Sequence, residues 1–101
     1  MSVVVTVRET AEGTLVAAAD ADCLGETYED GAVSLTVEES FYDGEGAEEL
    51  SPAAAVDRIR EGDTANLVGE TCVEAAVEAG LVDEETVLAV DGTRHAQIVW
   101  L

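Results

Sequence analysis

The sequence is almost devoid of positive charge. It contains no lysine and four arginines against 23 aspartates and glutamates, so its formal net charge is −19. Nonspecific binding to nucleic acids depends on clustered lysine and arginine. Arg8, Arg58, Arg60 and Arg94 form no such cluster. We therefore expect no nonspecific nucleic-acid binding, and we expect each arginine to pair with nearby carboxylates.

Residues that bind metals through nitrogen or sulfur are also scarce. Cys23 and Cys72 are far apart, no CxxC motif occurs, and His95 is the one histidine. A structural zinc site uses about four such ligands, and the glycines match no phosphate-binding loop. We therefore expect no metal and no cofactor. Cys72 lies in an apolar segment and is predicted to be a buried thiol, whereas Cys23 lies in a polar segment and is predicted to be exposed.

Long apolar runs are missing as well. No stretch approaches the ~18 residues that a membrane-spanning helix needs, and no basic leader precedes an apolar core at the start of the chain. We therefore expect a soluble, cytoplasmic protein with no membrane partner. A length of 101 residues fits one hydrophobic core, so residues 1–101 are expected to form a single compact domain.

The chain is rich in dispersed carboxylates and small apolar side chains. The acids run from Glu9 to Asp91 with no block of five or more, whereas an acidic interaction tail would be a block. The 16 alanines and 15 valines supply 31 of the 48 apolar residues. Above 1 M salt the Debye length falls to roughly 3 Å, so dispersed carboxylates repel one another little. The composition therefore indicates a halophilic protein.

Alternating and β-branched segments predict about five strands. Turn signals at Glu12-Gly13 and Asp91-Gly92 separate apolar runs and predict two hairpins. Between them, Val33, Leu35 and Val37 are expected to face the core from a half-buried strand. The segment 20–28 is interpreted as a helical turn or structured loop, and the segment 45–50 as a mobile loop. The predicted strands span residues 3–8, 15–19, 33–38, 87–90 and 93–100.

Two helices are predicted between the third and fourth strands. Ser51 and Pro52 supply the N-cap and the first position of a helix that Gly62 ends. Asp63 can cap a second helix that Gly80 ends. The expected fold is α+β, a mostly antiparallel sheet with both helices packed on one face. Apolar residues at spacings of three and four form the buried stripe of the second helix: Ala65, Val68, Gly69, Cys72, Val73, Ala76 and Val77.

The second predicted helix also carries polar candidates. Asn66 and Glu70 are four residues apart and would share one helix face at the edge of the apolar stripe. Such a pair can contact a ligand or anchor a neighbouring loop. Gly69 costs about 1 kcal/mol inside a helix, so its presence predicts that another backbone approaches closely there.

The last strand places the histidine on its less apolar face. If this face lines a cleft, His95 can act as a general acid or base; otherwise it is a structural or surface histidine of the strand. Its face-mates are Gln97 and Val99, and the opposite face carries Ala96, Ile98 and Trp100.

Five segments resemble the small archaeal family known as domain of unknown function 424. They are, in order, LVAAADADCLGETYEDG, FYDG, ANLVGE, EAGLVDEE and HAQIV, and the likeness extends from about Val3 to Val99. The resemblance implies a small archaeal protein and, by analogy, an association with translation. Its motifs mark five positions as binding a ligand or partner: Asn66, Gly69, Glu70, His95 and Gln97.

Three functional hypotheses follow. The first is a noncatalytic accessory or interaction protein, associated with ribosomes or a translation factor, that works by shape and a few polar contacts. The alternative is a small enzyme in which His95 is the general acid or base. It requires Asn66, Glu70 and Gln97 to converge with His95 in one pocket. A third hypothesis is a homodimer that forms through an exposed sheet face.

Overall fold

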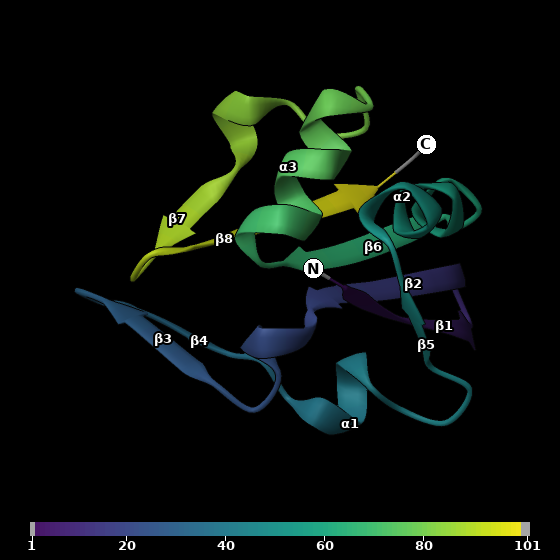
Figure 1. Cartoon of the computed structure of the whole chain (residues 1–101), viewed down its shortest axis with the longest axis horizontal. Coiled ribbons are helices and arrows are strands. Elements are labelled where there is room, and N and C mark those ends of the chain that lie inside the picture. The colour runs from purple at the N-terminus through teal and green to yellow at the C-terminus, as the bar shows by residue number, and fades with distance from the viewer. Residues whose placement is uncertain (1, 100–101) are drawn as a thin grey trace.

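The computed structural model describes residues 2–99, and six of the strands in that range form one sheet (Figure 1). The strand order is β5-β1-β2-β6-β8-β7, and β3 and β4 form a separate hairpin. No helix in the described part of the chain is long and apolar enough to cross a membrane. The elements are β1 (Val3–Thr10), β2 (Gly13–Asp20), η1 (Ala21–Cys23), β3 (Thr27–Asp30), β4 (Val33–Thr36), α1 (Glu39–Tyr42), β5 (Glu48–Leu50), α2 (Pro52–Arg60), β6 (Thr64–Val68), α3 (Glu70–Glu78), η2 (Glu84–Thr86), β7 (Leu88–Val90) and β8 (Thr93–Val99).

The fold class is α+β as predicted, with six rather than about five strands in the main sheet. Four of its five strand pairings are antiparallel, and the pairing of β2 with β6 is parallel. β5 pairs with the outer side of β1, and α2 then returns the chain across β1 and β2 to β6. Such a crossover is required because parallel strands cannot be joined by a tight turn.

Both hairpins predicted for the main sheet are confirmed. β1 pairs with β2 along its whole length, from Val3 opposite Asp20 to Thr10 opposite Gly13. β7 pairs with β8 around Asp91-Gly92, whose φ angles are 47° and 84°. A two-residue type I′ turn needs positive φ at both positions, which this dipeptide accepts readily.

Helices α2 and α3 cover one face of the main sheet, as predicted (Figure 1). The Ser51 hydroxyl accepts a hydrogen bond from the Ala54 N–H at 3.2 Å, and Pro52 occupies the first turn of α2. The larger hydrophobic core lies between these helices and the sheet. Its members include Val5, Val16, Ile59, Leu67, Val73 and Ile98.

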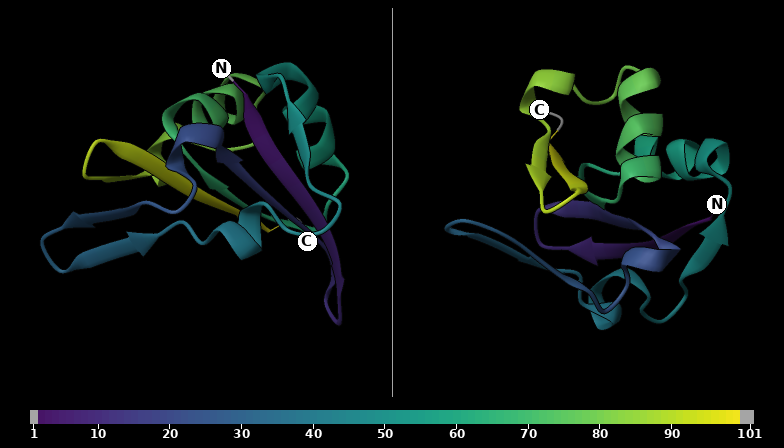
Figure 2. Two further views of the ribbon diagram at one scale, coloured as in Figure 1. Left: turned by 60° about the horizontal axis from the view of Figure 1, so that its bottom comes forward. Right: turned by 60° about the vertical axis from the view of Figure 1, so that its left-hand side comes forward.

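The opposite face of the sheet carries a smaller core. α1 lies against β1 and β2, and the Thr6 hydroxyl donates to the Tyr42 carbonyl at 2.6 Å. Figure 2 shows the β3–β4 hairpin projecting beyond the rest of the molecule on this side. The smaller core therefore covers only one end of the face. It contains Ala17, Ala19, Cys23, Val37, Tyr42 and Val68.

The arginines differ in their partners. Arg58 and Arg94 pair with Glu48 and Glu84, as predicted. Arg8 instead donates to the backbone carbonyls of Ser40 and Phe41 and lies 4.8 Å from the centre of the Phe41 ring. The prediction of a carboxylate partner is wrong for Arg8, because β1 directs it at the carbonyls of the α1 segment.

The predicted helix from residue 63 onward is wrong in its first part. Residues 64–68 form β6, and α3 begins at Glu70. β6 lies between β2 and β8, and its carboxyl end is covered on both faces, so Leu67 joins the larger core and Val68 the smaller one. A strand buried on both faces lacks the alternation of polar and apolar residues that identifies a strand. The apolar residues of β6 instead continue the spacing of three and four of the helix that follows, so the segment was predicted to be helical. Asn66 and Glu70 therefore share no helix face.

Three further expectations need correction. The segment predicted to be a mobile loop contains β5, which pairs with β1. Cys23 is buried, because η1 places it in the smaller core. Val33 is 41% exposed, because β4 belongs to the projecting hairpin and not to the main sheet. Val37 is fully buried as expected, and Trp100 lies outside the described residues.

Candidate ligand pocket at the start of helix α3

A carboxylate from a distant strand caps helix α3. Asp20 is the last residue of β2 and is 3% exposed. It accepts hydrogen bonds from the backbone N–H groups of Thr71, at 3.0 Å, and Cys72, at 2.8 Å. The first N–H groups of a helix have no acceptor within the helix, and an N-cap side chain usually satisfies them. Here the N-cap residue is Gly69, so Asp20 supplies the missing oxygen atoms.

Gly69 is required by this arrangement. Because β2 and β6 are parallel, both strands finish at the same end of the sheet. Asp20 and Gly69 meet at that end. A Cβ atom on Gly69 would lie 2.3 Å from Asp20 Cγ. The φ angle of Gly69 is 112°, which residues with a side chain rarely adopt. A close approach at Gly69 was predicted, but the neighbour is a side chain and not a backbone.

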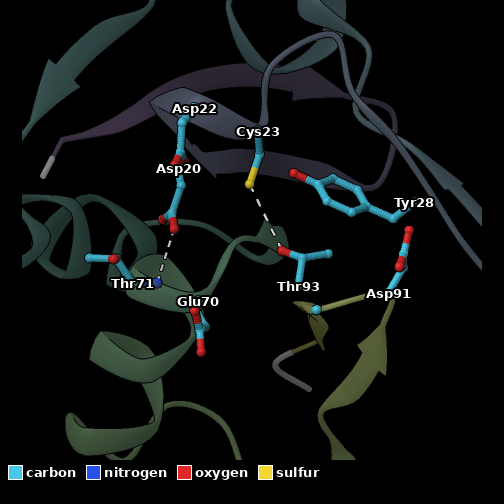
Figure 3. Close-up of a pocket in the computed structure, with 9 residues that line it drawn as sticks. Asp20, Asp22, Cys23, Tyr28, Glu70, Thr71, Asp91 and Thr93 are labelled. Carbon is cyan, nitrogen blue, oxygen red and sulfur yellow. Dashed lines mark hydrogen bonds between the residues drawn. The ribbon is translucent and has the colours of Figure 1, made fainter.

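Asp20 belongs to a pocket of about 210 Å³ beside the start of α3 and the turn between β7 and β8 (Figure 3). Within residues 2–99, no arginine or histidine lines this pocket. The pocket is therefore strongly negative and favours a cationic group. Its carboxylates belong to Asp20, Asp22, Glu70 and Asp91, and its other lining residues are Cys23, Tyr28, Thr71, Gly92 and Thr93.

Burial raises the pKa of Asp20, although its two hydrogen bonds from α3 oppose the increase. The charges of Asp22 and Glu70 raise it further. A nearby positive charge favours the ionised form of a carboxyl group. A cation in the pocket would therefore offset the repulsion among these carboxylates and lower the pKa of Asp20.

The pocket wall also contains a thiol and a phenol. Cys23 Sγ lies 3.8 Å from Thr93 Oγ1, and burial raises the pKa of the Cys23 thiol. Hydrogen bonding with Cys23, followed by burial, raises the pKa of Tyr28. Figure 3 shows the Tyr28 hydroxyl directed toward the Cys23 sulfur. Both groups are therefore held in their neutral forms.

Neither cysteine is suited to nucleophilic catalysis. Cys72 is 1% exposed, as predicted, and burial raises the pKa of its thiol. A nucleophilic cysteine acts as the thiolate and needs a lowered pKa. The raised pKa values of Cys23 and Cys72 have the opposite effect.

One group of described residues has the spacing of metal ligands. Ligand atoms of Asp20, Asp22 and Cys23 all lie within 4.8 Å of one another. However, both oxygens of Asp20 accept hydrogen bonds from α3, and the Cys23 thiol has a raised pKa. Metal ligands must be deprotonated, so these residues fit a metal ion poorly. The expectation of a protein without metal stays a prediction.

The predicted site residues lie in two places. Glu70 lines the pocket, and Gly69 shapes it through its backbone. The side chains of Asn66, His95 and Gln97 lie on the sheet face away from α2 and α3, because the residues that alternate with them belong to the larger core. The structure thus brings these three together and places Glu70 at the adjacent pocket.

We call this open region the β8 surface and define it as Asn66, Leu88, His95, Gln97 and Val99. Gln97 Nε2 donates to Asn66 Oδ1 at 2.9 Å, and His95 Nδ1 lies 2.9 Å from the Leu67 carbonyl oxygen. Leu88 lies opposite His95 and is 45% exposed, and Val99 is 64% exposed. Thr93 in the pocket lies two residues before His95 on the same strand face, so the pocket and the β8 surface adjoin.

Sequence reasoning missed three acidic residues of the pocket. Asp20, Asp22 and Asp91 come from the end of β2, from η1 and from the β7–β8 turn. Nothing in their local sequence distinguishes them from the many other carboxylates. The one available signal was an aspartate directly after the apolar run 15–19, and it becomes informative only when the pairing of β2 with β6 is known.

Comparisons with known proteins identify relatives but no activity. A family model described as "Protein of unknown function (DUF424)" matches residues 7–101. The chain is also similar to an uncharacterized conserved protein from Methanopyrus kandleri, known from a crystal structure. The identity is 26% and the TM-score 0.78, and the match covers 100% of this chain and 96% of that one. No curated protein matches the sequence.

Proposed function

The chain belongs to the DUF424 family, and we propose that it is a noncatalytic accessory protein that binds a positively charged partner protein. The contact surface consists of the acidic pocket and the adjoining β8 surface. The observation that carries this proposal is the continuity between a carboxylate-lined pocket and an open sheet face with exposed apolar side chains. Exposed apolar groups bordered by polar ones are typical of protein contacts.

The charge of the chain supports a basic partner. A net charge of −19 attracts cationic surfaces and repels phosphates over the range of the Debye length. In molar salt that range falls to roughly 3 Å. Recognition must then come from direct contacts, and the pocket offers four carboxylates within a small volume for a lysine or arginine side chain.

In its finer form, the proposal places the partner on the ribosome or among translation factors of a halophilic archaeal cytoplasm. The family resemblance and the acidic composition support this assignment. Ribosomal RNA would be repelled by the carboxylates of the chain. The contact is therefore made with a basic protein and not with RNA.

The test is gradient sedimentation of the tagged chain in an archaeal lysate prepared in molar KCl. We expect the chain to sediment with ribosomal particles. The double variant Glu70→Gln/Asp91→Asn removes two pocket charges, and asparagine accepts the positive φ at position 91. It should shift to the free fraction. Glu45→Gln/Asp57→Asn removes the same charge from exposed sites outside the pocket and should behave like the wild type.

Two results would contradict the proposal. If the wild-type chain sediments only as a free monomer at every growth stage, the ribosomal form of the proposal is wrong. If the pocket variant and the control variant lose association equally, general charge accounts for binding and the pocket does not.

An enzyme remains the alternative, although Glu70 lines the pocket while Asn66, His95 and Gln97 lie on the adjoining β8 surface. One observation favours it. The Leu67 carbonyl can only accept a hydrogen bond, so its contact with His95 Nδ1 places the proton there and leaves Nε2 as an acceptor in the neutral ring. This tautomer suits a general base. A screen with hydrolase and isomerase substrates would test the alternative. Turnover that His95→Ala abolishes and Gln97→Ala reduces would support it, and turnover that His95→Ala leaves unchanged would exclude a role for His95.

A further inference from the structure

The main sheet ends in two edge strands of different character. β5 is acidic: Glu48 pairs with Arg58 at 2.9 Å, and Glu49 accepts a hydrogen bond from the Ser2 hydroxyl at 2.7 Å. β7, at the other edge, consists of Leu88, Ala89 and Val90 and carries no charged side chain. Charged residues on an edge strand discourage pairing with other chains. β7 therefore lacks the charged side chains that protect β5.

The backbone of β7 has unused pairing capacity. Val90 and Thr93 flank the two-residue turn and form the hydrogen-bonded pair of this type of hairpin. Residues of an antiparallel strand alternate between bonding to the partner strand and facing away from it. Ala89 thus turns its N–H and C=O outward. Ala89 is exposed, and the β3–β4 hairpin lies against β7 without pairing with it.

We propose that β7 is the docking edge for an extended, basic segment of the partner protein, which adds a strand beside Ala89. The inference rests on the proposed function, because the same partner would occupy the pocket and the β8 surface. Strand addition gains affinity from backbone hydrogen bonds and specificity from alternate side chains. On the open face of the sheet, the exposed Leu88 offers a contact for an apolar side chain of the added strand.

Charge complementarity selects a basic segment. Asp91 follows β7 directly and lines the pocket, and Glu85 lies three residues before the strand. Both are exposed, whereas Glu84 is already paired with Arg94. A segment that runs along β7 can therefore place one lysine or arginine in the pocket and another beside Glu85.

A second copy of the chain fits this edge poorly. It has the same net charge of −19 and no lysine, so it would bring further carboxylates to a negative region. Like charges that face each other across an interface are unfavourable. The proposed occupant is therefore a basic segment of a different protein.

The test uses the full chain and three synthetic peptides. The first peptide has a central run of valine and threonine with one arginine at each end, the second is identical but carries a methyl group on one central backbone nitrogen, and the third has glutamate in place of both arginines. Titration calorimetry at low and molar KCl gives the affinities. Amide hydrogen exchange followed by NMR gives the protection of Ala89, and the amides of β5 serve as the control edge.

We expect the first peptide to bind and to slow the exchange of Ala89 about tenfold or more, with no change in β5. Backbone methylation removes one hydrogen bond and should weaken binding about fivefold to tenfold. The glutamate peptide should not bind. Equal affinity of the first two peptides, or unchanged exchange at Ala89, would overturn strand addition. Protection of Ala89 that increases with protein concentration alone would show that the occupant is a second copy and would likewise overturn the proposal.

The outcomes separate this inference from the proposed function. Peptide binding that Glu70→Gln/Asp91→Asn weakens, without any protection of Ala89, would reject strand addition and support the pocket as the binding site. If none of the peptides binds while the chain still sediments with its partner in a pocket-dependent manner, strand addition alone is wrong. If neither association occurs, both proposals are wrong.

Discussion

The two faces of the six-stranded sheet differ in how much of their surface is covered by other elements. One face lies under α2 and α3 and carries the larger core. The other face is covered over β1, β2 and the end of β6 by the smaller core, and it is open at the β8 surface. Figure 2 shows the helices on one side and the projecting hairpin on the other. Burial of apolar surface stabilises the first face, while the second exposes apolar and neutral polar groups beside a negative pocket. Stability is thus assigned to one side of the sheet, and the proposed binding surface lies on the other.

The largest expected effect would test this assignment directly. Leu67→Ala removes a fully buried side chain from the helix-covered face and should lower the free energy of unfolding by about 2–5 kcal/mol. Val99→Ala shortens an exposed side chain on the open face and should change it by about 0.5 kcal/mol or less. Urea unfolding in molar KCl measures both. Equal losses would show that the two faces contribute alike.

The next largest effect on stability is expected at Gly69, at the end of β6 where the pocket forms. Gly69→Ala strains a positive φ, which costs about 1–3 kcal/mol, and also displaces Asp20 from the α3 N–H groups. Gly80→Ala is the matched control, since Gly80 has a φ of 78° and an added Cβ would meet no atom of residues 2–99 within 4 Å. We expect the Gly69 variant to be clearly the less stable in the same unfolding assay. Equal stabilities would mean that the contact with Asp20 is unimportant.

A smaller effect is the pH dependence that Asp20 contributes. Burial raises its pKa above the ordinary value of 3.8, so the folded state binds this proton more tightly than the unfolded chain. The stability that the proton contributes is present below pH 3.8 and is lost as the pH rises through the folded pKa. Asp20→Asn removes this titration. The measurement is the free energy of unfolding of the wild type minus that of the variant. This difference should fall as the pH rises, and a difference that increases with pH would contradict the raised pKa of Asp20.

The smallest expected effect on stability lies on the β8 surface. Gln97→Ala removes an exposed hydrogen bond to Asn66 and should cost about 0.5 kcal/mol or less, because water replaces the lost partner. The same variant should weaken association with the partner in the sedimentation assay. A loss of stability as large as that of Leu67→Ala would show that the β8 surface is structural.

Elements whose partners are close in sequence could be predicted well. The hairpins around Glu12-Gly13 and Asp91-Gly92 and the start of α2 at Ser51-Pro52 depend on turn geometry and capping, which a few adjacent residues decide. β6 could not be predicted in this way. Its apolar residues pack into both hydrophobic cores, Leu67 into the larger and Val68 into the smaller. Only the position of the strand between β2 and β8 explains why consecutive residues are apolar.

The candidate site was predictable only in part. The family resemblance drew attention to Gly69 and Glu70, and both lie at the start of α3. Asp20 and Asp91 escaped notice because a carboxylate is ordinary in so acidic a chain. Their common position results from two strand pairings between segments far apart in sequence.

The sequence by itself determined the charge, the fold class, the hairpins and the apolar face of α2, because each depends on composition or on residues within a few positions of one another. Only the tertiary structure decided which carboxylates meet. The parallel pairing of β2 with β6 sets Asp20 against Gly69, and the β7–β8 turn brings Asp91 to the same place. Contacts between distant segments depend on how the whole sheet closes around its core, which no local pattern encodes.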